Sequence, residues 1–306
     1  YQGVGFGPTG FFASDLLGTP VSAFVYQGAP VVSVGNRLWL GYEWKFGAAF
    51  GWKHFGKNNV EHSGVVSTGE TAHMAVGLRL HYRLSPRVEL SFGVEASHFS
   101  NGNTSWPNAG VNSVGASVAM ACSLNPVRRN AAVSEQLVQA ADKPRWFCDL
   151  AAYGAWRKRV VRIGYPVEPT LCPGVFGVAG LQIAPMRKLN RWVAVGMSMD
   201  LQWDESAGLS EYWVEWTDSD NPKFNKPPFF KQLGVGVSGH AELTMPVFSI
   251  NAGLGYAVVS PKGDRRFYQS LTLKTFLTEM IFLNVGYRLG RFKEPQNLML
   301  GIGVRI

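Results

Sequence analysis

The sequence predicts an all-β fold, an antiparallel up-and-down transmembrane β-barrel of about 12–14 strands. Three observations support this prediction. Only 16% of the 306 residues are charged while 46% are hydrophobic, and 35 Gly accompany 19 Phe, 10 Trp and 10 Tyr. No apolar run approaches the roughly 18–20 residues that a membrane-spanning helix needs. Several segments alternate apolar and polar residues with period two, which is typical of strands with one lipid-facing and one lumen-facing side.

The N-terminal third contains the clearest of these alternations. Residues 20–27 and 31–44 are apolar segments that we interpret as strands, and residues 56–71 are a polar loop. Residues 72–84 place apolar side chains on one face and a basic ladder that includes Arg79 on the other. An oily outer face and a charged inner face are the reverse of a soluble sandwich, and they favour a barrel.

A hairpin of residues 88–100 and 112–120 follows, and it carries unexpected polar groups. The first strand has apolar residues at alternate positions on one face: Leu90, Phe92, Val94 and Ala96. His98 and Ser100 keep the parity of this apolar face, and Asn112 has the same parity on the returning strand. Polar groups that face hydrocarbon cost free energy, so their presence calls for a function.

The residue types of this hairpin suit nucleophilic catalysis. His98 and Ser100 are neighbours on one face, so the imidazole could serve as the base for the hydroxyl. Asn112 could orient the histidine through its side-chain oxygen, and Asn101 with the backbone amide of Gly102 could supply an oxyanion site. A His-x-Ser pattern on a strand is a weak signal by itself, and a structural pair of polar residues at a strand end is the alternative.

The remainder of the chain continues the series of strands within what we interpret as one barrel domain, residues 1–306. Residues 123–145 are a longer polar stretch with a candidate helix at 131–141, and we interpret them as a periplasmic insertion. Residues 204–231 form a long external loop rich in Trp, Pro and charge. The predicted strands cover residues 146–156, 175–184, 192–203, 233–244, 247–259, 267–275, 280–289 and 297–306.

Turn lengths predict the orientation of the strands in the membrane. Outer-membrane barrels have short periplasmic turns and longer external loops. Short turns at residues 85–87, 185–191 and 277–279 fall at one end, and long loops at the other. His98 and Ser100 are therefore expected near the outer rim, on the lipid-facing surface.

Two short strings within the hairpin resemble a known family. Residues 98–103 read His-Phe-Ser-Asn-Gly-Asn, and residues 107–112 read Pro-Asn-Ala-Gly-Val-Asn. They are similar to the signature of the PagL-type lipid A 3-O-deacylases, which are acyloxyacyl-hydrolase-like outer-membrane barrels. The resemblance is specific over residues 78–118. It is looser over residues 236–306, which resemble the C-terminal half of the longer Bacteroidota-type members.

The resemblance implies a function and a place in the cell. It implies an esterase of the bacterial outer membrane that removes the 3-O-linked acyl chain of lipid A, the lipid part of lipopolysaccharide, without a metal or another cofactor. The catalytic histidine and serine of the family fall on His98 and Ser100, and its oxyanion asparagine falls on Asn101.

One position departs from the family pattern. The glutamate that the family uses as third triad member falls on Asn112, and an amide stabilises an imidazolium less than a carboxylate does. Glu95 is close in sequence but has the opposite parity and is expected to face the lumen. The alternative function is therefore a catalytically silent barrel that serves as a structural or complex-forming component of the membrane.

We interpret the remaining histidine, glutamate and cysteine residues of interest as structural. His240 and Glu242 share the polar parity of their segment and are expected to face the lumen, so we assign no metal site to them. Cys122, Cys148 and Cys172 are interpreted as small buried thiols, with a Cys122–Cys148 disulfide left open.

The chain carries a net charge of +8, which the barrel interpretation places on the membrane surface. A lipid-facing barrel argues against nucleic acid as the partner. Basic residues at the predicted external end, such as Arg157, Arg159 and Arg162, could attract the phosphates of lipid A, or they could simply be a solvated loop rim.

Overall fold

The computed structural model describes most of the chain. The described residues are 1–54, 65–106, 108–124, 145–163, 168–214, 223–245, 248–261, 265–292 and 294–306. In this part of the chain, no helix has the length and apolar character needed to cross a membrane.

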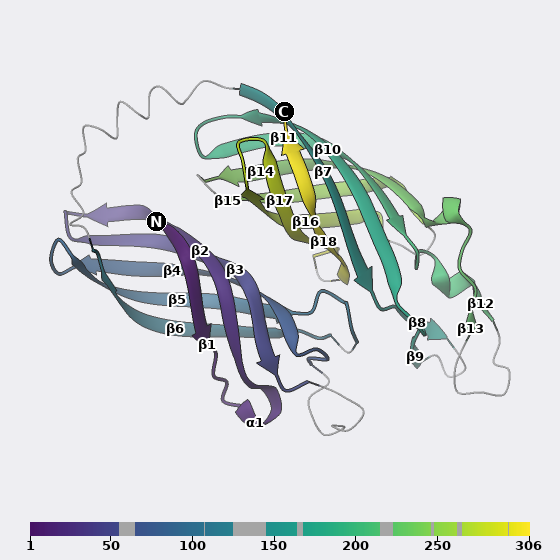
Figure 1. Ribbon diagram of the computed structural model, residues 1–306, viewed down its shortest axis with the longest axis horizontal. Coiled ribbons are helices and arrows are strands. Elements are labelled where there is room, and N and C mark those ends of the chain that lie inside the picture. Colours follow the sequence, from purple (N-terminus) through teal and green to yellow (C-terminus); the bar gives the residue numbers. More distant parts are fainter. Residues whose placement is uncertain are drawn as a thin grey trace. The chain divides into compact units, whose positions relative to one another are not determined.

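The chain folds into two compact units, and the first is an antiparallel sheet of six strands in chain order (Figure 1). A short helix, α1 (Ser14–Leu17), connects the first two strands. The strands are β1 (Gln2–Pro8), β2 (Gly18–Val34), β3 (Leu38–Trp52), β4 (Glu70–Arg83), β5 (Val88–Ser100) and β6 (Val111–Cys122).

The turn between β2 and β3 lies later in the chain than the sequence indicated. We predicted a break at residues 28–30, but β2 remains extended through Pro30 and the turn comes at residues 35–37. Pro30 is accommodated because the β2–β3 pairing is irregular between Pro30 and Val32. Gly35 adopts a φ of 62°, a conformation that glycine reaches at little cost. The strand β1 was not predicted at all.

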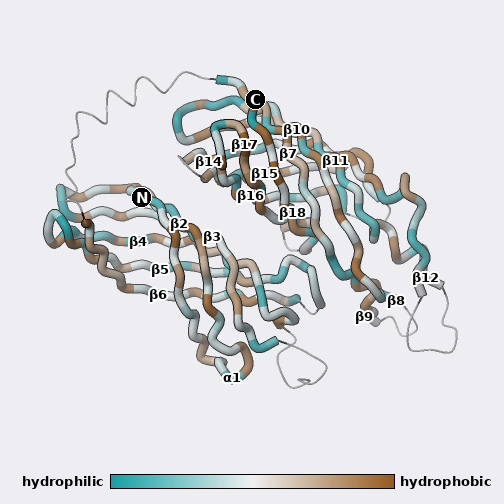
Figure 2. The backbone as a smooth tube through the Cα atoms, in the orientation of Figure 1, coloured by the Kyte–Doolittle hydropathy of each residue, from teal (hydrophilic) through white to brown (hydrophobic). Residues whose placement is uncertain are grey.

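The two faces of this sheet differ as the alternation predicted. On β4, Val76 and Leu78 are 60% and 56% exposed, whereas Arg79 and His81, on the opposite face, are 8% and 4% exposed. The buried guanidinium of Arg79 donates to Glu43 on β3, at 3.1 Å. One face is therefore apolar and outward, and the other is a packed polar face. Figure 2 shows the alternation along the strands.

The second unit contains a closed antiparallel barrel of eight strands. The ring closes where β18 (Glu294–Arg305) pairs with β7 (Arg145–Arg157), which Figure 1 shows as yellow beside teal. Between them in the ring lie β10 (Phe176–Lys188), β11 (Val193–Asp204), β14 (Leu233–Thr244), β15 (Phe248–Val259), β16 (Phe267–Phe276) and β17 (Ile281–Gly290).

The loops at one end of this barrel carry short elements that the sequence did not reveal. They are the strand pairs β8 (Val160–Ile163) with β9 (Glu168–Leu171) and β12 (Trp213–Val214) with β13 (Lys223–Phe224), and the 3-10 turns η1 (Leu209–Glu211) and η2 (Phe229–Gln232). Three of these elements, η1, β12 and β13, lie within the predicted loop of residues 204–231, and η2 begins within it.

The barrel is apolar outside and polar inside, as expected for a barrel in a membrane. Outward side chains such as Met197 and Leu254 are 64% and 54% exposed. The lumen near the short-turn end is filled by buried charges: Lys274 contacts Asp149 at 2.7 Å and Glu242 at 2.6 Å, and Arg305 binds the same two carboxylates. Buried charges are tolerated when they are paired in this way. Glu242 and His240 face the lumen, as predicted.

The predicted antiparallel β-barrel is confirmed, with a difference in its closure. The ring closes within the C-terminal half at eight strands, and the six N-terminal strands form a separate sheet. Alternation identifies strands but not their partners, so the closure was not visible in the sequence. The assignment of residues 1–306 to one barrel domain stays a prediction. Of the expected periplasmic insertion at residues 123–145, residues 125–144, which include the candidate helix at 131–141, lie outside the described residues.

The cysteines are free thiols that differ in exposure. Cys172 is buried, Cys148 is intermediate and Cys122 is exposed. The expectation of small buried thiols is therefore correct for Cys172 and wrong for Cys122, because Cys122 ends β6 on the outward face that also carries Met120.

Candidate active site

The β5–β6 hairpin brings the predicted histidine and asparagine together. His98 and Asn112 are direct cross-strand partners in the antiparallel register. The His98 Nδ1 and Asn112 Oδ1 atoms are 2.7 Å apart. A carboxamide oxygen only accepts hydrogen bonds, so Nδ1 carries the proton in this pair. Nε2 is then the ring nitrogen with the lone pair.

Ser100 lies two residues beyond His98 on the same face of β5. The two Cα atoms of such a pair are roughly 6.5 Å apart. Ser100 is 8% exposed, and its Oγ accepts a hydrogen bond from Asn108 Nδ2 at 3.3 Å.

The loop after β5 is organised by asparagine side chains. Asn101 Nδ2 donates to Ser67 Oγ at 3.1 Å and to the Ser105 carbonyl oxygen at 3.2 Å, and the Asn101 backbone N–H donates to Asn108 Oδ1 at 3.3 Å. Asn108 therefore links the Ser100 hydroxyl to the backbone of the next residue. The Asn101 amide holds the loop in this state, and its predicted oxyanion role stays a prediction, as does that of Gly102.

Backbone conformation brings the loop against the histidine. Gly102 and Asn103 have φ values of 66° and 69°, and Gly110, directly before β6, has a φ of 72°. A Cβ atom on Gly110 would lie 3.0 Å from His98 Cε1. Glycine is required there both for the left-handed conformation and for the close approach to the imidazole.

An apolar cluster on the opposite face supports the end of the hairpin. Phe99 is 1% exposed and packs in a buried cluster with Trp52 and Val111, among others. Its ring stacks on His73 with centroids 4.4 Å apart. Because Phe99 lies between His98 and Ser100 in the strand, burial of its ring fixes the backbone that carries both. The buried cluster around Phe99 thus supports the strand segment that carries the polar site.

Glu95 does not complete the site, as its parity predicted. It lies on the polar face of the sheet, where the Lys45 ammonium contacts its carboxylate at 2.5 Å. Asn112 is therefore the group bound to the His98 ring.

Apolar side chains surround the site on the outward face. Val94 and Phe92 on β5 are 47% and 51% exposed, and Val114 and Val118 on β6 are each 78% exposed. His98 and Asn112 thus lie where an oily strip ends and a polar loop begins. A molecule with a fatty chain and a polar head matches this boundary.

The structure brings the predicted site residues into one hairpin and adds two that we had not assigned roles. Asn108 contacts both Ser100 and Asn101, and Gly110 packs against the His98 ring. Both lie in the string 107–112 that resembled the family signature, and that string was the available signal. Ser67 lies before β4, and no sequence feature indicated its contact with Asn101.

Two family models match the chain. The model described as "Acyloxyacyl hydrolase, C-terminal domain" matches residues 146–306, which hold the eight-stranded barrel. The model described as "Lipid A 3-O-deacylase (PagL)" matches residues 68–121, which hold His98, Ser100 and Asn112. No curated protein matches the chain.

Solved structures of outer-membrane proteins are distantly similar. The siderophore receptor PirA from Acinetobacter baumannii is 8% identical, with 94% of this chain and 48% of the receptor covered, at a TM-score of 0.22. The Pseudomonas putida toluene transporter TodX is 10% identical, with 99% and 85% covered, at a TM-score of 0.22. The chain thus spans about half the length of the receptor that it matches. Similarity at this level carries no argument about the chain.

The acyloxyacyl hydrolase model alone covers more than half of the 306 residues, and the deacylase model covers the hairpin that carries the site. The chain therefore belongs to the PagL-type lipid A deacylase family of ester hydrolases, as an antiparallel β-barrel protein of the bacterial outer membrane.

Proposed function

We propose that this protein removes the 3-O-linked acyl chain of lipid A, with Ser100 as nucleophile, His98 as general base and Asn112 as the residue that orients His98. The observation that carries the proposal is the 2.7 Å contact between His98 Nδ1 and Asn112 Oδ1, on the same outward face as Ser100. Base, orienting group and hydroxyl are the three parts that serine esterases require.

The hydrogen bond to Asn112 selects the useful tautomer of His98. With the proton on Nδ1, Nε2 can accept the hydroxyl proton of Ser100. Gly110 keeps the loop against the ring and so limits where the imidazole can turn. Held in this way, the base does not have to be ordered at the moment of reaction.

The surroundings match a lipid whose ester lies at the boundary between hydrocarbon and headgroup. The acyl chain is placed along the outward apolar strip of β5 and β6, next to Val94 and Val114. The sugar headgroup is placed at the loop after β5. The ester bond then lies level with His98 and Ser100, which end the strip.

The reaction follows from these positions. Ser100 Oγ forms a bond with the ester carbonyl carbon while His98 Nε2 takes its proton, and backbone and side-chain amides near Asn101 and Gly102 stabilise the oxyanion. The carbon–oxygen bond to the sugar breaks, and His98 gives the proton to the departing 3-oxygen, which leaves as a hydroxyl. Water then attacks the acyl-serine while His98 takes its proton. The bond between the acyl carbon and Ser100 Oγ breaks, the proton returns to Oγ, and the fatty acid leaves.

Asn112 in place of a carboxylate lowers the expected rate without removing the mechanism. The amide fixes the tautomer as a carboxylate would, but it adds no charge to stabilise the imidazolium. We therefore expect a working but slow enzyme.

The test compares the lipid A of bacteria that produce the protein with that of bacteria that lack it, by mass spectrometry. Wild-type protein should yield lipid A that lacks one 3-linked acyl chain. Ser100→Ala should abolish this change. Ser97→Ala is the matched control, because Ser97 lies on the same strand with the opposite parity and should leave deacylation unchanged.

Barrel formation in each variant is checked by the shift in electrophoretic mobility on heating. Unchanged lipid A with correctly folded wild-type protein would contradict the proposal and would leave a structural role for the barrel.

A further inference from the structure

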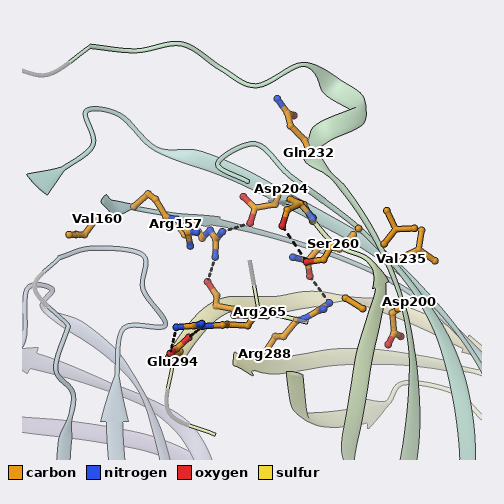
Figure 3. A pocket seen from close by; sticks show the side chains of 18 of the residues that line it. Arg157, Val160, Asp200, Asp204, Gln232, Val235, Ser260, Arg265, Arg288 and Glu294 are labelled. Carbon is orange, nitrogen blue, oxygen red and sulfur yellow. Dashed lines mark hydrogen bonds and ion pairs between the residues drawn. The ribbon is translucent and has the colours of Figure 1, made fainter. Parts of the chain in front are cut away.

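The eight-stranded barrel encloses a cavity at the end opposite its charge cluster of Asp149, Glu242, Lys274 and Arg305. The cavity measures about 750 Å³ and is lined entirely by residues of the second unit (Figure 3). Its lining includes residues from the end of β7, the end of β11, the start of β14, the end of β17 and the start of β18. A cavity of this size accepts a small organic ligand.

The lining of the cavity is rich in arginine. Among the described residues that form it are five arginines and three carboxylates. Two of the arginines are neutralised locally: Arg157 pairs with Asp204, and Arg265 pairs with Glu294 at 2.8 Å. The lining therefore carries an excess of two positive charges, and Arg162 at its rim is exposed.

Arg288 is the buried arginine of the cavity without an ion pair in the described part of the chain. It is 8% exposed, its Nη1 donates to Gln202 Oε1 at 2.9 Å, and its guanidinium lies 3.6 Å from the centroid of the Tyr268 ring. Its Nε is buried and has no hydrogen-bond partner among the described residues. A buried guanidinium with an unused donor is costly unless an anion or another acceptor completes it.

One of the lining carboxylates, Asp200, is already satisfied by neutral donors. Asp200 accepts hydrogen bonds from Ser198 at 2.8 Å, from Ser238 at 2.7 Å and from the Tyr268 hydroxyl, and it forms no ion pair within the described residues. Tyr268 thus contacts both charged groups: its hydroxyl donates to the Asp200 carboxylate, and the face of its ring packs against the Arg288 guanidinium. The guanidinium is left as the inner positive group of the cavity.

We propose that this cavity binds a small soluble phosphate-bearing molecule, such as a sugar phosphate, with Arg288 as the inner anchor and Arg162 at the entrance. The planar guanidinium matches phosphate oxygens through paired N–H groups. The residues line the inside of the barrel, which favours a ligand that enters from water over a lipid headgroup. The proposal is independent of the deacylase site, because every residue involved lies in the other unit.

Binding is measured on the full-length protein in a neutral detergent, by calorimetric titration with inorganic phosphate and with glucose 1-phosphate. We expect saturable binding of one molecule per chain that weakens as salt is raised. Arg288→Gln should weaken it about 10- to 100-fold, the equivalent of one charge-assisted hydrogen bond. Arg162→Gln, at the exposed rim, should weaken it only about two- to fivefold and does not threaten folding.

Arg187→Gln is the matched control, because Arg187 is exposed on β10 near the opposite end of the barrel and its loss changes the net charge equally. It should leave binding unchanged.

Three results would overturn the proposal. The first is the absence of binding by either phosphate compound to the folded wild-type protein. The second is equal binding by wild type, Arg288→Gln and Arg162→Gln. The third is displacement of the sugar phosphate by phosphatidic acid added to the detergent micelles, which would assign the cavity to a lipid headgroup. Lipid A deacylation is measured in the same samples, and its loss or retention does not bear on this result.

Discussion

Two histidines in this protein each contact an asparagine side chain through Nδ1. One lies on the outward face of the first sheet, and the other lies inside the barrel. His98 Nδ1 lies 2.7 Å from Asn112 Oδ1, and His240 Nδ1 lies 2.6 Å from Asn251 Oδ1. Each histidine also has a serine two residues away on its own strand, Ser100 in one case and Ser238 in the other. By spacing and chemistry the two sets are alike.

They differ in access and in what else binds the serine. Ser238 Oγ is 2.8 Å from His240 Nε2 but is also bonded to Asp200, is 2% exposed and does not line the cavity. Ser100 and His98 lie at the edge of an exposed apolar strip. The inner set has more hydrogen bonds among the described residues, and Ser238 is more deeply buried than Ser100, which is 8% exposed. The comparison teaches that triad-like geometry alone does not identify a catalytic set, and our proposal assigns catalysis to the His98 set because it borders the apolar strip.

The largest expected difference between the two sets is in the rate of deacylation. His98→Gln should lower the rate about 10⁴-fold, as loss of the base does in serine hydrolases. His240→Gln should leave the rate within about twofold, although it removes contacts with two serines inside the barrel. The rates are measured on purified lipid A with both proteins shown to be folded. A comparable loss in both variants would remove the distinction.

The second prediction concerns the buried cluster around Phe99, which supports the strand that carries His98 and Ser100. Phe99→Ala should destabilise the first unit by about 3–5 kcal/mol, because it empties a buried cluster. Phe92→Ala is the control, since Phe92 lies on the same strand but is 51% exposed on the outward face. Denaturant unfolding in detergent measures the effect. Equal losses in the two variants would show that the cluster does not support the site.

The third prediction sharpens the role of Asn112. Asn112→Glu should raise the deacylation rate about 10- to 100-fold, since a carboxylate bonds an imidazolium more strongly than an amide does. Asn112→Ala should lower it. Asn251→Asp, the equivalent change inside the barrel, should leave it unchanged. A slower Asn112→Glu enzyme would show that the orienting role is wrong.

The smallest effect is expected at Gly110. Gly110→Ala places a Cβ 3.0 Å from the His98 ring in a backbone conformation with a φ of 72°, so we expect a three- to tenfold lower rate and about 1–2 kcal/mol lower stability. Gly115→Ala is the control, because a Cβ there meets nothing within 4 Å. Kinetics and unfolding of both variants check the difference, and equal behaviour would contradict the contact.

Much of the first sheet could be predicted from local pattern. The alternation over residues 72–84 placed Arg79 and His81 on the correct face, and parity alone placed Glu95 away from His98. Parity is a local property of a strand, so no knowledge of partners was needed. The pairing of His98 with Asn112 also required a register, which the loop between them sets and which the structure supplies.

The features that escaped prediction depend on contacts distant in sequence. The closure of the ring through β18 and β7 joins segments at opposite ends of the second unit, and no local pattern encodes it. The position of Arg288 in the cavity depends on its contacts with Gln202 and Tyr268, and the three residues come from three different strands. Asn108 lay in a recognised string, yet its bond to Ser100 depends on the shape of the loop.

The most direct test of the central claim is covalent labelling of the folded protein with a long-chain alkyl fluorophosphonate, followed by peptide mass spectrometry. Attack by a serine oxygen forms the oxygen–phosphorus bond and releases fluoride, while the neighbouring histidine takes the proton. We expect the label on Ser100, its loss in His98→Ala, and no label on Ser238. A label on Ser238, or an unlabelled Ser100 in protein that removes the acyl chain from lipid A, would contradict the account.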